Sequence, residues 1–266
     1  MKFLILLTLG LLSLLGPAAW AQDNATLVRA AKNPLSDVIN VPILYDANLN
    51  TGSNRQTQHM LTFQPVIPFG INSQWTLITR TILPLTVQPP LADGESWTSG
   101  LGDTQFSAFL SPAHTREWVW GVGPVFQLPS ASHEALGQGK WAAGPTAAAI
   151  KYDGPWTYGA LINNVWSVAG GAGRAAVNQM QLQPLINYNF PGNPDRYIEF
   201  SPTFTANWKE SGGERWTVPL GGGIGQLVKF GAQPVNLQAT AYYYAAKPTG
   251  GPNWTLELTV QFLFPK

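Results

Sequence analysis

The chain contains no cysteine and little charge. None of its 266 residues is a cysteine, which excludes a disulfide framework and thiolate metal sites. Charged residues make up only 11% of the chain, against about 25% in ordinary soluble domains. The formal net charge is +1 and no basic run is present, so the sequence does not indicate nucleic-acid binding.

Long apolar runs are also missing after the first 22 residues. A membrane-spanning helix needs about 18 or more consecutive apolar residues, and no later stretch approaches this length. Hydrophobic residues nevertheless make up 45% of the chain, with 11 Trp, 8 Tyr and 12 Phe. This combination favours a transmembrane β-barrel with aromatic girdles at the two membrane interfaces. A secreted β-sandwich of low charge would share part of this composition.

The first 21 residues have the organisation of a secretory signal peptide. Lys2 supplies the positive charge, Phe3–Leu15 the apolar core and Ala19–Ala21 a small-residue cleavage site. An uncleaved membrane anchor is the alternative, but the apolar core is short and ends in a Gly-Pro pair. We therefore expect residues 1–21 to be cleaved and the mature chain to reach the outer membrane of a Gram-negative bacterium.

The last strand has the clearest pattern. Apolar and polar residues alternate strictly through Trp254–Phe264, which places all the apolar side chains on one face of an extended strand. About ten alternating residues are many for a soluble strand, but they suit a strand that crosses a bilayer at a tilt. The apolar face would contact lipid, and the polar face, with Glu257 and Gln261, would face a lumen.

Similar alternation between turn signals predicts about twelve strands. They are expected at Val38–Ala47, Gln58–Phe69, Trp75–Val87, Gly102–Leu110, Trp118–Leu128, Trp141–Tyr152, Trp156–Val168, Gln179–Phe190, Tyr197–Trp208, Arg215–Val228, Val235–Ala245 and Trp254–Phe264. Short and long connections broadly alternate, as they do when short turns face the periplasm and long loops face outward. We predict an all-β fold in which residues 38–266 form one antiparallel transmembrane β-barrel of outer-membrane type.

Prolines inside these strands are the main objection to the assignment. Proline removes a ladder hydrogen bond and avoids central strands unless it lies at a strand end or a bulge. The prolines concerned are Pro65, Pro124, Pro145, Pro184, Pro202 and Pro219.

Residues 22–37 precede the first strand and do not alternate. Leu27, Val28, Ala30 and Ala31 favour a short helix that ends before Asn33 and Pro34. Such a helix would plug the lumen or lie at its periplasmic mouth, while a flexible terminus is the simpler alternative.

Strand parity assigns a set of polar side chains to the lumen. Charge is costly on the lipid face of a barrel, whereas residues of the lumen tune selectivity. The candidate lumen-lining residues are Arg80, Gln179, Gln181, Gln183, Glu199, Arg215, Gln238, Glu257 and Gln261. Their charges either line an open path for solutes or pair with one another in a closed interior. Barrel size does not decide between an open and a closed interior, because twelve strands lie between filled eight-stranded barrels and open sixteen-stranded porins.

Catalytic and metal-binding signatures are weak. His59, His114 and His133 lack metal-ligand spacing, and nothing indicates a metal or another cofactor. Ser132, His133 and Glu134 are residue types of a hydrolytic triad, but neighbours on a loop rarely bring nucleophile and base within reach. We expect a protein that is not an enzyme. An outer-membrane lipid hydrolase and a structural or adhesive barrel with a sealed lumen stay open as alternatives.

A resemblance to a known family covers nearly the whole mature chain. The matching stretches are Asn33–Pro42 (NPLSDVINVP), Gln64–Phe69 (QPVIPF), Trp75–Leu85 (WTLITRTILPL), Ser99–Pro112 (SGLGDTQFSAFLSP), Trp120–Pro129 (WGVGPVFQLP), Leu136–Pro145 (LGQGKWAAGP), Leu161–Ser167 (LINNVWS), Arg215–Gly223 (RWTVPLGGG) and Gln261–Lys266 (QFLFPK). The chain resembles the outer-membrane transporter family related to phenol-degradation MetA-pathway proteins, often labelled "transporter" or "neuromedin U". The resemblance implies a barrel for passive passage of small hydrophobic or aromatic solutes, and it brings no functional residues with it.

Phe262 and Phe264 are the candidate assembly signal. Most outer-membrane barrels end on an aromatic residue, whereas this chain ends in Phe264-Pro265-Lys266. We therefore expect the barrel-assembly machinery to recognise Phe262 and Phe264. Outer-membrane lipid is the other expected partner.

Overall fold

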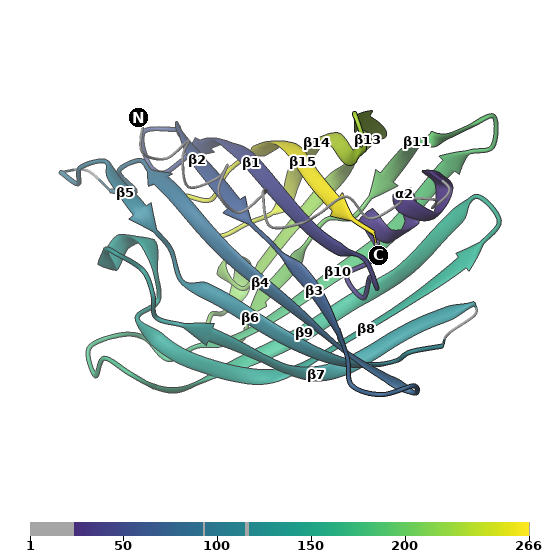
Figure 1. Cartoon of the computed structure of the whole chain (residues 1–266). Coiled ribbons are helices and arrows are strands. Elements are labelled where there is room, and N and C mark those ends of the chain that lie inside the picture. The colour runs from purple at the N-terminus through teal and green to yellow at the C-terminus, as the bar shows by residue number, and fades with distance from the viewer. Residues whose placement is uncertain (1–23, 93, 115–116, 266) are drawn as a thin grey trace.

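The described residues form one closed antiparallel β-barrel (Figure 1). The computed structural model describes residues 24–92, 94–114 and 117–265, so the predicted signal peptide at residues 1–21 lies outside them. Fifteen strands make up a single sheet. Three pairs of them (β2 with β3, β5 with β6, and β11 with β12) are the two halves of one barrel strand, which gives the twelve strands that the alternation predicts.

The strands follow one another around the barrel in chain order. They are β1 (Ile39–Thr51), β2 (Gln56–Phe63), β3 (Val66–Gly70), β4 (Trp75–Gln88), β5 (Thr98–Leu101), β6 (Thr104–Pro112), β7 (Trp118–Leu128), β8 (Lys140–Asp153), β9 (Trp156–Gly170), β10 (Asn178–Phe190), β11 (Asn193–Phe200), β12 (Phe204–Asn207), β13 (Trp216–Phe230), β14 (Gln233–Ala246) and β15 (Trp254–Phe264). In the described part of the chain, the α-helix α2 (Asn24–Lys32) precedes them, and 3-10 turns occur at Glu134–Leu136 and Gly212–Glu214. No helix in the described ranges has the length and apolar character needed to cross a membrane.

The barrel closes between its first and last strands. β1 and β15 pair antiparallel from Ile39 opposite Phe264 to Leu49 opposite Trp254. A closed sheet has no exposed edge with unpaired backbone groups, which is the condition for β-strands to cross lipid.

The two faces of the barrel wall differ in chemistry. Large apolar side chains are exposed outside, for example Leu83, Leu85, Leu256 and Leu258. Polar residues on the alternate positions, such as Thr259, are buried inside. This division between lipid-facing and lumen-facing residues is that of a transmembrane barrel. It also assigns the faces of β8 and β9, which sequence patterning left open: Trp141, Ile162 and Trp166 are exposed, and Ala142, Ala148, Leu161 and Val165 are buried.

Two-residue turns gather at one end of the barrel, which we call the turn end. These turns are residues 154–155, 191–192 and 231–232. Gly154 and Gly231 have φ of 53° and 61°, a left-handed conformation that glycine adopts without strain. The C-terminal end of β15 lies at the same end, because Gln233 donates to the Leu263 carbonyl at 2.7 Å. The longer connections lie at the opposite, loop end (Figure 1).

The strand prolines coincide with breaks in the hydrogen-bond ladder. Pro65 lies between β2 and β3, and Pro202 lies between β11 and β12. Pro219 stands at a register shift between β13 and β14. Pro124 and Pro145 face each other across β7 and β8, and each borders a gap in the pairing to its other neighbour. The prolines therefore bend the barrel wall without breaking it, and Pro65 and Pro202 lie where the predicted strands Gln58–Phe69 and Tyr197–Trp208 are each split in two.

Candidate functional site in the barrel lumen

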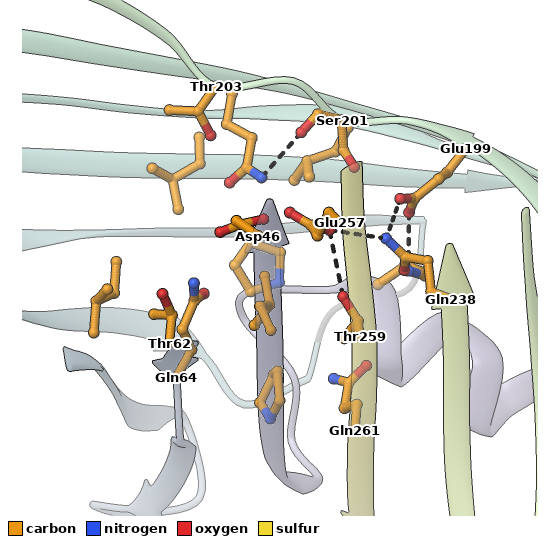
Figure 2. Close-up of a pocket in the computed structure, with 18 of the residues that line it drawn as sticks. Asp46, Thr62, Gln64, Glu199, Ser201, Thr203, Gln238, Glu257, Thr259 and Gln261 are labelled. Atoms are coloured by element: carbon orange, nitrogen blue, oxygen red, sulfur yellow. Dashed lines mark hydrogen bonds and ion pairs between the residues drawn. The ribbon is translucent and has the colours of Figure 1, made fainter. Parts of the chain in front are cut away.

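The barrel interior holds a cavity of about 510 Å³. Its polar lining comes mainly from amides, hydroxyls and carboxylates on β1, β2, β10, β11, β14 and β15 (Figure 2). Apolar surface is interspersed with these groups: Leu44, Met60, Ile82, Leu161 and Leu185. The lumen therefore offers hydrogen-bonding groups and hydrocarbon surface side by side.

Most of the predicted lumen residues contribute to this cavity. Those that line it are Arg80, Gln181, Gln183, Glu199, Gln238, Glu257 and Gln261. Gln179 shares their parity on β10 but lies nearer the loop end, where it accepts a hydrogen bond from Gln138 at 3.3 Å. Strand parity thus predicts which side chains face the lumen wherever the strand is continuous.

Arg215 is not among the residues that line the cavity. Parity assigned it to the lumen on the assumption that its strand begins at Arg215, but β13 begins at Trp216. The Arg215 guanidinium instead lies 5.9 Å from the centre of the Trp208 ring and donates to the Glu210 carbonyl at 3.0 Å. This cation–π contact holds the Arg215 side chain at the loop, away from the cavity lining.

Two charged residues of the cavity were not predicted. Asp46 lies on the inner face of β1, and Lys32 is the last residue of α2. Parity could have identified Asp46, because Tyr45 and Ala47 were assigned to the same strand. Lys32 has no such signal, since it belongs to the segment without alternation.

Lys32 joins α2 to the barrel wall through a buried ion pair. Its Nζ lies 2.8 Å from Oε2 of Glu199, and the two side chains are 10% and 1% exposed. Nζ also donates to Gln238 and lies 4.5 Å from the centre of the Tyr197 ring. Burial lowers the pKa of Lys32, but Glu199 and Tyr197 together raise it further, so the pKa lies above its usual value and the ammonium stays charged.

The rest of α2 packs inside the turn end. Leu27 and Val28 are buried against Tyr197, Leu227 and Leu263 on the inner faces of β11, β13 and β15. This packing hides apolar helix surface that the open lumen would expose to water.

Polar contacts tie the C-terminal part of α2 to the barrel. Arg29 donates to the Gly154 carbonyl at 2.6 Å, and Gln261 donates to the Ala31 carbonyl at 3.0 Å. The helix therefore occupies part of the lumen cross-section at the turn end, as Figure 1 shows.

Arg80 is held differently from Lys32. Its guanidinium donates to the Gln64 side chain at 2.9 Å. Within the described ranges, the ion pairs closer than 4.0 Å are Lys32–Glu199 and Arg174–Glu134, so Arg80 has no carboxylate at that distance. Arg80 thus provides a positive charge in the lumen that an acid does not directly neutralise.

The triad-like residues of the β7–β8 loop form loop structure. Ser132 Oγ accepts from the Leu101 amide at 3.0 Å, and His133 Nδ1 accepts from the Ala135 amide at 3.2 Å. Glu134 is 90% exposed and lies 3.9 Å from Arg174. Each side chain therefore has a local structural partner, and the hydrogen bonds connect these residues to the backbone of the loop end.

The closed barrel with an apolar outer belt and a polar lumen defines a class: transmembrane β-barrels of the outer-membrane type. Searches with the sequence against family models and curated proteins give no match. Among solved structures, an outer-membrane channel from Pseudomonas putida F1 is similar, with a TM-score of 0.61 and 15% identity over 85% of this chain and 95% of that one. This similarity supports the fold.

Two other barrels are more distant. Outer membrane phospholipase A from Escherichia coli has a TM-score of 0.43 and 12% identity, covering 86% of this chain and 90% of the phospholipase. A FadL homologue from Pseudomonas aeruginosa has a TM-score of 0.43 and 7% identity, covering 95% of this chain and 96% of its own.

Proposed function

We propose that this protein is an outer-membrane channel for passive passage of small solutes through the barrel lumen. The observation that carries the proposal is the cavity of about 510 Å³ enclosed by the barrel wall and lined by polar side chains. A barrel that only anchors loops gains nothing from a partly buried charge such as Arg80 in its interior, because desolvating it is costly. The similarity of fold to the Pseudomonas putida channel adds support.

The lining favours small amphipathic solutes. Gln181, Gln183 and Gln64 present amide groups, while Leu44 and Ile82 present apolar surface in the same cavity. A compact solute with an aromatic body and a polar substituent would satisfy both kinds of surface. Movement would follow the concentration gradient, and the turn end would face the periplasm.

Arg80→Ala should shift the ion selectivity of the channel toward cations. Arg80 lines the cavity and lacks a carboxylate within 4.0 Å, so its removal deletes a positive charge that repels cations. The measurement is single-channel recording of the refolded protein in a planar bilayer, with the reversal potential taken under a KCl gradient. We expect discrete ohmic steps and a cation-to-anion permeability ratio raised about threefold or more, the change that about 0.7 kcal/mol of electrostatic energy produces.

Arg196→Ala is the matched control, because Arg196 is exposed and bonds Gln226 on the neighbouring strand. It should leave the reversal potential unchanged. A folded wild-type barrel that stays silent, with α2 in place or deleted, would contradict passage through the lumen and favour the sealed, structural alternative.

A further inference from the structure

Two carboxyl groups face each other in the lumen. Asp46 on β1 and Glu257 on β15 are directly opposed in the register of the closing seam. Side chains directly opposed in an antiparallel pair have Cβ atoms about 4.5–5.5 Å apart, and like charges in that arrangement are destabilising. Both residues line the cavity, where Figure 2 shows their carboxyl groups next to each other.

The pair has no cation of its own within the described part of the chain. Lys32 is used by Glu199 at 2.8 Å, and Arg80 bonds Gln64. The ion pairs found closer than 4.0 Å include neither Asp46 nor Glu257. Gln238 and Thr259 give Glu257 hydrogen bonds of 3.5 and 3.3 Å. These neutral donors do not neutralise the charge of two adjacent carboxylates.

Asp46 in addition carries an unsatisfied acceptor. The residue is 7% exposed, and its Oδ1 atom is buried without a hydrogen-bond partner. A buried acceptor left unpaired is costly, and such exceptions call for a missing partner. The missing partner is a donor, and beside Glu257 the favoured donor is positively charged.

The groups around the two carboxyls favour an organic cation over a metal ion. Within the described ranges, no group of three or more His, Asp or Glu side chains could hold a metal ion. The cavity also presents the phenol rings of Tyr242 and Tyr244 together with apolar side chains such as Leu44. Aromatic faces attract ammonium groups, and apolar walls suit a hydrocarbon body. A bare metal ion would use neither.

We propose that Asp46 and Glu257 form a binding site for the ammonium group of small organic amines that enter the lumen. This inference rests on the proposed function in one respect: it names the class of solute that the channel prefers. Two carboxyl groups would accept hydrogen bonds from one ammonium, which also removes their mutual repulsion. The amine side chain would lie against the apolar and tyrosine surface of the cavity.

Calorimetry with two probes of similar shape tests the site. Benzylamine is protonated at neutral pH, and benzyl alcohol is its neutral counterpart. For the detergent-folded full-length protein we expect benzylamine to bind at least about tenfold more tightly, because charge-assisted hydrogen bonds are the stronger ones. Asp46→Asn with Glu257→Gln preserves side-chain size and should abolish this preference. Glu134→Gln, which alters a carboxylate in an exposed loop, should retain it.

The outcomes separate the site from the channel. Equal affinity for the two probes, or a preference that survives in the folded double variant, would overturn the ammonium site, including the case in which the two carboxyls merely share a proton. If the double variant does not fold, the single Asp46→Asn variant replaces it, and a reduction in preference of about tenfold is expected there. Conductance in KCl is recorded on the same preparations. A conducting barrel without amine preference refutes the site alone, and a silent barrel that binds benzylamine refutes passage alone.

Discussion

Lys32→Met should increase the open probability of the channel by at least about tenfold. The substitution keeps an unbranched side chain of similar length but removes the ammonium group that forms the 2.8 Å ion pair with Glu199. Removing one partner of a buried ion pair costs about 3–5 kcal/mol, because the other charge stays buried and unpaired. Displacing α2 from the lumen would let water reach Glu199 and relieve this cost. Loss of the ion pair therefore shifts the equilibrium toward the displaced state of α2.

The expected size follows from what else holds the helix. Leu27 and Val28 remain packed against the barrel, and Gln261 still bonds the Ala31 carbonyl. These contacts oppose release, so the helix should be displaced in a larger fraction of molecules without being lost. A shift of 1.4 kcal/mol toward the displaced state already gives a tenfold change in its equilibrium constant. Dwell times in planar-bilayer recordings measure this change.

Lys32→Met combined with Glu199→Gln is the matched control. It replaces both ions with neutral groups, and replacement of a whole buried pair is often nearly neutral. The double variant should therefore return toward the wild-type open probability, and the cycle isolates the energy of the pair. Open probability that is unchanged in Lys32→Met, or that rises equally in both variants, would show that the ion pair does not retain α2.

Alternation made the barrel predictable because it is a local property of each strand. A lipid-facing side chain and a lumen-facing side chain must alternate, so Trp254–Phe264 reveals its two faces without knowledge of its neighbours. The same rule placed Arg80 and Glu257 in the cavity. It failed for Arg215, because a strand boundary depends on loop contacts such as that with Trp208, which no periodicity encodes.

The lumen contacts could not be predicted in the same way. Lys32 and Glu199 are 167 residues apart in the sequence, and their pairing depends on where α2 enters the closed barrel. The opposition of Asp46 and Glu257 similarly requires the register of the seam between β1 and β15. Parity gives the face of a residue but not its neighbour, and register comes from the assembled sheet.

Deleting residues 262–266 should abolish the folded barrel in the outer membrane. The deletion removes Phe262, Leu263 and Phe264, which pair with Val41, Asn40 and Ile39 in the closing seam. It also removes the buried side chain of Leu263 from the cluster that packs against α2. An unclosed seam leaves backbone groups without partners in lipid, at a cost of several kcal/mol each. The measurement is the loss of the heat-modifiable folded band from outer-membrane fractions.

Phe262→Ala with Phe264→Ala distinguishes closure from recognition. This variant keeps the backbone ladder of the seam, because β15 retains its length and its register with β1. If the two aromatic rings act as the assembly signal, the variant should fail to assemble in cells yet refold from urea into detergent micelles. The deletion should fail in both settings, since it removes part of the seam itself. Normal insertion of the deletion variant would refute both roles, and normal assembly of the alanine variant would refute recognition alone.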